Sequence, residues 1–236
     1  MKEVLYIQRF ADGFLADCIN DKNVKQQVAI IETRGAVVSP VDEHPGYYLF
    51  FGMTKEPNIF RKHPLLFLCE AEHTTHGQLI EALFNDASRM KALVIYANRG
   101  PSRKQQAGFY RDIWTHRVRQ NVPLRVMPAP SVKDVDYGMG IIRDWTREDA
   151  IVRPKKRPTV LAKQMTEEMR EQVVDPAEDR WYAFHALRYL IAGFIKDPPI
   201  AIRAPGRMMA DRFDDVSVPA TQMYSGGHRS RLGAWT

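Results

Sequence analysis

Carboxylates and imidazoles gather in one short stretch of this 236-residue chain, Glu70 to His76. Glu70 and Glu72 are two residues apart in a run typical of a β-strand, so both point to the same side of it. His73 and His76 follow where the strand gives way to a helix, a common place for a site in an α/β sheet. Two carboxylates can hold Mg²⁺, and carboxylates with imidazoles can hold Mn²⁺ or Zn²⁺. The alternative is structural: these groups end the strand and cap the helix through one of the two intervening threonines.

Further acidic residues are candidates to complete a metal cluster. Asp12 and Asp17 lie near the first strands, and Glu178 lies at the start of the last predicted helix. Glu178 shares a helix face with His185, because residues three or four apart, and seven apart, lie on one side of a helix. It also stands three residues after Asp175, the spacing of a capping box, so a structural role is the alternative for Glu178.

Basic residues give the chain a formal net charge of +6, which favours an anionic partner, with nucleic acid first. One group lies in a glycine-containing loop that leads into a helix N-terminus, where backbone amides and cations suit a phosphate. A simply solvated loop is the alternative. The candidate DNA-binding residues are Arg99, Arg103, Lys104, Lys133, Lys155, Lys156 and Arg157. The chain contains no Walker A pattern, so it does not resemble a P-loop ATPase.

The composition is that of a soluble globular protein, with 44% hydrophobic and 26% charged residues. No apolar run reaches the roughly 18–20 residues that cross a bilayer, and the N-terminus lacks the apolar segment of a signal peptide. We therefore expect a cytoplasmic protein with no membrane partner. Cys18 and Cys69 are too few for a disulfide framework and are expected to be reduced core residues.

Two patterns succeed each other along the chain. Short aromatic and β-branched runs predict strands over the first 70 residues, and helix and strand signals then alternate. The expected strands are 4–10, 13–19, 27–35, 47–53, 64–72, a run within 91–100, 123–131 and 150–154. The expected helices are 76–90, 103–121, 136–148, 159–172 and 175–194. This order predicts a mixed α/β sheet, antiparallel strands first and parallel strands after, with helices on both faces. We expect one domain over 1–200 and a basic extended tail over 201–236.

The last predicted helix has two contrasting faces. Its apolar face consists of Phe184, Leu187, Ile191, Phe194 and Ile195. Its other face carries Trp181, His185, Arg188 and Tyr189. The simplest interpretation is an amphipathic core helix with a solvated face, and the alternative is a face that lines a groove.

The C-terminal part of this pattern resembles the end of the nuclease domain of tailed-phage large terminases. The segment HALRYLI, His185 to Ile191, is similar to the DALRYA-like helix that closes that domain. A short helix, a strand and a helix precede it in the same order, over 136–169. LFLCEAEH and ALVIYANRG, each followed by a helix, are similar to the middle of the domain. The similarity covers roughly residues 1–196.

The resemblance implies an RNase H-like fold and an endonuclease that cuts packaged DNA with two Mg²⁺ or Mn²⁺ ions on clustered carboxylates. One ion would activate the attacking water and the other would stabilise the leaving oxygen. If this chain cleaves DNA, we expect a rearranged cluster, with catalytic roles for Glu70, Glu72, Glu178 and His185 and metal ligation by Glu70, Glu72 and Asp17. Three positions depart from the family pattern. His185 stands where the family has the acid of its last helix, Asn98 stands where an acid ends a strand, and Gln8 lies near the position of the first acid.

Three functions are consistent with these residues. The first is a hydrolase, a DNA-packaging endonuclease acting on double-stranded DNA in the host-cell cytoplasm. Its expected partners are a separate packaging ATPase subunit, the small terminase or the portal. The second, favoured by the substitutions at Asn98 and His185, is a catalytically inactive relative that binds DNA or the packaging assembly. The third is an unrelated metal-dependent enzyme that uses Glu70, Glu72, His73 and His76.

Overall fold

The computed structural model describes residues 3–10, 13–19, 23–41, 44–97, 103–129, 135–154, 159–171 and 181–199. All of them belong to one compact unit, 1–202. The expected tail over 201–236 lies outside the described residues and stays a prediction. None of the helices in the described part of the chain combines the length and the apolar character that crossing a membrane requires.

The described elements are eight strands and five helices. The strands are β1 Glu3–Phe10, β2 Gly13–Ile19, β3 Lys25–Val38, β4 Gly46–Thr54, β5 Leu65–His73, β6 Val94–Ala97, β7 Arg125–Pro128 and β8 Ile151–Pro154. The helices are α1 His76–Arg89, α2 Arg103–Gln120, α3 Val135–Arg147, α4 Val160–Glu171 and α5 Tyr182–Lys196. Element types and order agree with the sequence prediction, although α5 begins seven residues later than expected.

Five strands form the part of the sheet that carries helices on both faces. Their order is β5-β4-β3-β6-β7, in which β3, β4 and β5 are antiparallel and β6 and β7 run parallel to β3. Three antiparallel strands followed by two parallel ones is the RNase H-like arrangement, so the predicted fold class is confirmed. The central strand is β3. The sequence pattern places Gln8, on the strand 4–10, near the first acid of the family. That placement is wrong, because the strand over 4–10 is β1, which lies outside these five strands.

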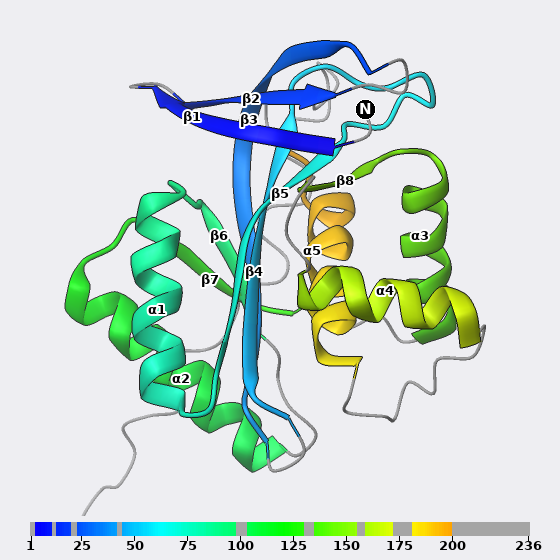
Figure 1. Ribbon diagram of the computed structural model, residues 1–236. Coiled ribbons are helices and arrows are strands. Elements are labelled where there is room, and N and C mark those ends of the chain that lie inside the picture. The colour runs from blue at the N-terminus through cyan, green and yellow to red at the C-terminus, as the bar shows by residue number, and fades with distance from the viewer. Residues whose placement is uncertain are drawn as a thin grey trace, which may run out of the picture. The chain divides into compact units, whose positions relative to one another are not determined.

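The remaining strands close a ring at one end of the long strands. β1 pairs with β2, β2 with β3, and β8 joins β5 to β1, so that the pairings of β1, β2, β3, β4, β5 and β8 return to their start. A register shift between Ile30 and Glu32 marks where β3 passes from the ring into the RNase H-like sheet. Figure 1 shows β1 and β2 lying across the end of β3, β4 and β5.

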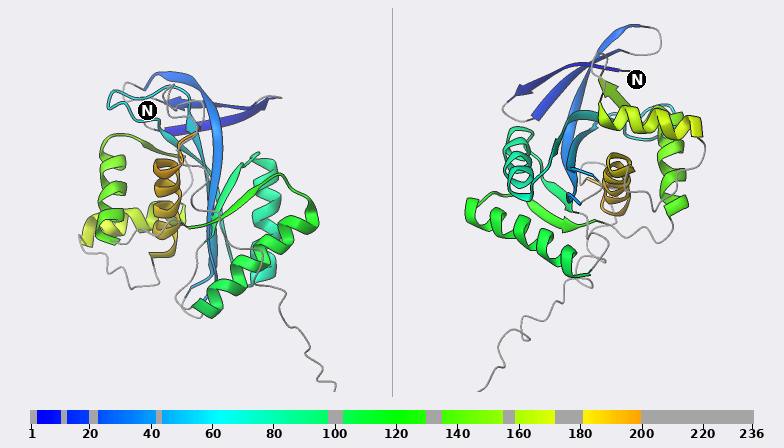
Figure 2. Two further views of the ribbon diagram at one scale, coloured as in Figure 1. Left: turned by 180° about the vertical axis from the view of Figure 1, so that it is seen from behind. Right: turned by 60° about the horizontal axis from the view of Figure 1, so that its bottom comes forward.

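Two hydrophobic layers enclose the RNase H-like sheet (Figures 1 and 2). Helices α1 and α2 cover one face, where Tyr48 and Phe50 of β4 meet the apolar residues of these helices. Helices α3, α4 and α5 cover the other face, where Leu49 and Phe51 meet Leu187 and its neighbours. Because successive side chains of a strand point to opposite faces, β4 supplies both layers and is buried along its whole length.

Helix α5 approaches the sheet closely at Gly193. A Cβ atom there would lie 2.1 Å from the ring of Tyr96, so only glycine fits. Arg34 of β3 forms hydrogen bonds at this close contact. Its Nη1 donates to the Gly193 carbonyl at 3.1 Å and to the Tyr96 hydroxyl at 2.8 Å, and its Nε pairs with Glu32 at 2.5 Å. The guanidinium also lies 4.5 Å from the centre of the Phe194 ring. These contacts tie α5 to the central strand.

Candidate functional site

Glu70 holds the N-terminus of α4. Its Oε1 accepts from the backbone N–H of Val160 at 2.6 Å, and its Oε2 accepts from Leu161 N–H at 3.2 Å and from the Tyr47 hydroxyl at 2.6 Å. The first amides of a helix have no partner within the helix and carry a partial positive charge, so a carboxylate is well suited to them. Both oxygens of Glu70 are therefore engaged by the chain itself.

Glu72 lies two residues further along β5 on the same face and is exposed. Its Oε1 accepts a short hydrogen bond from the Tyr182 hydroxyl at the start of α5. The Tyr182 ring stacks on His44, with centroids 4.8 Å apart, and meets the edge of Tyr47 at 5.6 Å. Burial, and secondly the charge of Glu70, raise the pKa of Tyr47 well above its ordinary value. Burial, and secondly the hydrogen bond to Glu72, raise the pKa of Tyr182. Both phenols therefore remain hydrogen-bond donors to the two carboxylates.

The two histidines of the predicted cluster lie on the opposite face of the sheet from the carboxylates. The His73 ring stacks on Tyr48 at 6.3 Å, and the His76 ring lies 5.1 Å from that of Phe109 of α2. Thr75 caps α1 through a 3.4 Å bond from Gln78 N–H to its hydroxyl, so the expected threonine cap is confirmed. The structure thus brings Glu70 and Glu72 together and separates them from both imidazoles, because strand residues alternate between faces.

Cys69 lies between the two carboxylates in sequence but faces α1. Its thiol is 3.6 Å from Asp86 Oδ2, and burial, with Asp86 second, raises its pKa from 9.0 to about 12. A folded-state pKa above the unfolded one stabilises the fold below about pH 9, and this contribution is lost as pH rises toward 12. We expect the free energy of unfolding to fall more steeply between about pH 8.5 and 10.5 in the parent chain than in Cys69→Ser, measured by urea denaturation. Equal slopes would contradict the burial of the thiol.

The face of α5 opposite its apolar side is not the solvated face expected from the sequence. Trp181 is 1% exposed and Arg188 is 8% exposed, whereas Tyr182, His185 and Tyr189 are half-buried. The expected apolar residues are buried except Ile195, which is 52% exposed. The backbone amides of Ala183 and Phe184 donate to Gln164 Oε1 of α4, at 3.0 and 3.1 Å. This cap from a neighbouring helix has no local sequence signal, and Asp175 and Glu178 lie outside the described residues.

The C-terminal part of the central strand presents no acid toward α5, and Glu32, earlier on the same strand, is paired with Arg34. Residues Ala36 and Val38 of β3 belong to the hydrophobic layer that α5 covers, and the parallel register sets Val37 beside Ala97, the last residue of β6. Asn98, which follows Ala97, lies outside the described residues. A carboxylate cluster centred on β3 and β6 would need an acid where this chain has small and branched apolar side chains.

Asp17 and the basic candidates lie elsewhere. Asp17 is on β2, from which β1 and β8 separate the Glu70 strand, and its Oδ1 accepts from the Gln27 side chain at 3.2 Å. Arg103 and Lys104 stand in the first turn of α2. Arg99, Lys133, Lys155, Lys156 and Arg157 lie outside the described residues, as do the side chains of Arg103 and Lys104.

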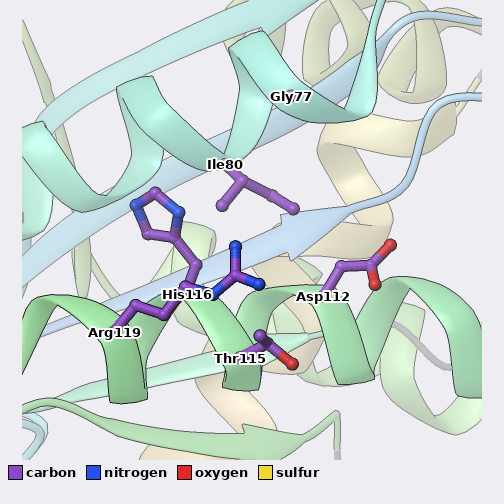
Figure 3. Close-up of a pocket in the computed structure, with 6 residues that line it drawn as sticks. All are labelled: Gly77, Ile80, Asp112, Thr115, His116 and Arg119. Carbon is purple, nitrogen blue, oxygen red and sulfur yellow. The ribbon is translucent and has the colours of Figure 1, made fainter.

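A pocket of about 260 Å³ lies between α1 and α2 (Figure 3). It is lined by Gly77, Ile80, Asp112, Thr115, His116 and Arg119. The lining is mostly polar, with one aliphatic side chain, and the volume is below that of common small-molecule sites, which are larger and mostly apolar. His116 packs its ring 4.8 Å from Phe84, which gives it a structural role.

The described residues do not fit the two-metal centre that the terminase resemblance implies. Among them, no three or more His, Cys, Asp or Glu side chains gather as a metal centre would require. The carboxylate oxygens of Glu70 accept hydrogen bonds from two backbone amides and a phenol. One oxygen of Glu72 accepts a hydrogen bond from Tyr182. Close divalent cations need several carboxylates to offset their repulsion.

Solved structures of terminase nucleases are similar to this chain. The large terminase nuclease domain of bacteriophage SPP1, solved with bound Mn, is 15% identical over 76% of this chain and 92% of its own, with a TM-score of 0.46. The human cytomegalovirus terminase nuclease domain is 9% identical over 69% and 82%, with a TM-score of 0.47. The large terminase nuclease of thermophilic phage G20c with bound zinc is 9% identical over 81% and 93%, with a TM-score of 0.43.

No family model and no curated protein matches the chain. The similarity to terminase nuclease domains is therefore one of structure at low sequence identity. The RNase H-like description of this chain rests on its own strand order.

Proposed function

We propose that this chain is an RNase H-like domain of the phage DNA-packaging machinery that binds double-stranded DNA in the host-cell cytoplasm without cleaving it. The observation that carries the proposal is the engagement of Glu70 by the first turn of α4 and by Tyr47. Three of the roughly four lone-pair sites of this carboxylate accept hydrogen bonds in the fold, which leaves little capacity for ligating a metal. The net charge of +6 supports an anionic partner. A packaging ATPase, the small terminase or the portal remain the proposed protein partners.

A second candidate is the metal-dependent endonuclease, acting with Mg²⁺ or Mn²⁺. Exposed Glu72, whose described hydrogen bond is with Tyr182, favours it. Glu72 is the carboxylate that can turn outward with the smaller structural loss. His185, one turn along α5 from Tyr182, and Glu178 would be its proposed neighbours in such a site.

The DNA contact is proposed to include the start of α2. Arg103 and Lys104 occupy its first turn, and Arg111 and Arg119 are exposed further along the same helix. Helix N-termini and clustered cations bind phosphates without reading sequence. Binding of this kind weakens as salt increases, by a slope of about 0.9 per phosphate contact in a log–log plot.

Salt dependence tests this footprint. We expect Arg103→Ala/Lys104→Ala to reduce the slope of duplex affinity against salt by about 1–2, measured by fluorescence anisotropy with a labelled duplex. The charge-matched control is Arg147→Ala/Lys163→Ala, which removes two exposed cations from α3 and α4. An unchanged slope in the α2 variant, or an equal change in the control, would remove the start of α2 from the DNA contact.

A further inference from the structure

Arg188 is a buried cation with two unpaired nitrogens among the described residues. It is 8% exposed, and neither its Nε nor its Nη1 has a hydrogen-bond partner. Its described contact is with the ring of Tyr189, whose centre lies 5.2 Å from the guanidinium carbon. A buried guanidinium normally satisfies its fork of five N–H donors, because an unpaired buried charge is costly. Within the described part of the chain, two donors of Arg188 therefore have no acceptor.

Arg34 shows how this fold satisfies a buried arginine. It is 2% exposed, and its guanidinium donates to Glu32, to the Tyr96 hydroxyl and to the Gly193 carbonyl. Arg34 contacts α5, Arg188 belongs to α5, and each guanidinium lies near an aromatic ring. The difference lies in the anion, which Arg34 has in Glu32. Among the ion pairs of the described residues, none includes Arg188.

The two carboxylates of the candidate site are already engaged. Glu70 serves α4 and Tyr47, and Glu72 serves Tyr182, six residues before Arg188 on the same helix. At 100° per residue, Arg188 lies opposite Leu190, on the α5 face of half-buried His185 and of Trp181, which is buried in the same core layer as Leu190. No carboxylate among the described residues therefore balances Arg188.

We propose that Arg188 binds a phosphate group, supplied by the backbone of the bound nucleic acid. The planar guanidinium fork matches two phosphate oxygens, and a partly desolvated site strengthens each charge-assisted bond. The net positive charge of the chain favours a phosphate source over an acidic protein. That the phosphate comes from nucleic acid rests on the proposed DNA-binding function. The anion site itself does not rest on it, because free phosphate presents the same oxygen atoms to Arg188.

Thermal unfolding of the full chain in phosphate tests the anion site. At constant ionic strength, replacing chloride by inorganic phosphate at about ten times its Kd should raise the Tm by roughly 3–6 °C. Arg188→Met should unfold at or above the parent Tm in chloride, because it removes an unpaired charge, and should lose the phosphate shift. Arg188→Lys should keep part of the shift. A lower Tm of Arg188→Met in chloride, or a full shift in that variant, would overturn the proposal.

Measuring the binding of a short DNA duplex distinguishes the nucleic-acid backbone from free phosphate as the source of the phosphate group. We expect Arg188→Met to weaken binding of a short duplex about tenfold or more, while the exposed control Arg147→Met changes it less than about twofold. If the parent binds no duplex but its phosphate shift depends on Arg188, the anion site stands and the DNA-binding function fails. If duplex binding is equal in the parent and in Arg188→Met, the nucleic-acid source fails while the function stands. Loss of both phosphate and duplex effects in the variant supports the whole proposal.

Discussion

Replacing Arg34 by methionine should lower the free energy of unfolding by about 3–5 kcal/mol. The substitution removes the bonds to Tyr96 and Gly193 and leaves Glu32, whose side chain is 12% exposed, as an unpaired, partly buried carboxylate. Breaking one half of a buried ion pair is strongly destabilising for this reason, whereas replacing both halves can be nearly neutral. Urea denaturation followed by circular dichroism measures the loss.

The double variant Glu32→Gln/Arg34→Met is the control for Arg34. It should recover at least half of the lost stability, since no charge remains buried without a partner. Arg188→Met, which replaces an arginine of similar burial, should show no such loss. A loss below about 1 kcal/mol in Arg34→Met would mean that Arg34 does not anchor α5 to the central strand.

Replacing Glu70 by alanine should cost about 2–4 kcal/mol, because it leaves two helix N-terminal amides and the buried Tyr47 hydroxyl without an acceptor. Glu72→Ala should lower the free energy of unfolding by less than about 1 kcal/mol, since Glu72 is exposed. Both values are to be measured by urea denaturation in the presence of EDTA, so that metal binding does not contribute.

Glu70→Gln separates charge from shape at this position. The amide oxygen can accept at most two of the three bonds, and the NH₂ group faces another donor, so the variant should lie between the parent and Glu70→Ala. If Glu70→Ala were as stable as the parent, the carboxylate would be dispensable to the fold, and a role in metal binding would become the better explanation.

Local patterns in the sequence were sufficient for most of the fold. The helix over 76–90 and the strand over 47–53 match α1 and β4 within a few residues, because their apolar spacing follows the period of each element. The antiparallel-then-parallel order followed from the succession of strand and helix signals. The pairing of β2 with β3, which closes the ring, is a long-range contact that no local pattern encodes.

The candidate site was predictable only in part. That Glu70 and Glu72 share a face follows from strand alternation, and so does their separation from His73. The capture of Glu70 by α4 could not be predicted, because it joins residues ninety positions apart. The burial of Arg188 contradicts its sequence environment, since an arginine on the polar face of an amphipathic helix is usually solvated.

Incubation of the pure protein with supercoiled plasmid in Mn²⁺, Mg²⁺ or EDTA tests the central proposal most directly. We predict that the plasmid stays supercoiled in all three and is retained by the protein in a gel shift at low salt. Metal-dependent nicking by the parent that is lost in Glu72→Gln, a variant expected to keep the fold, would contradict the proposal and identify an active nuclease.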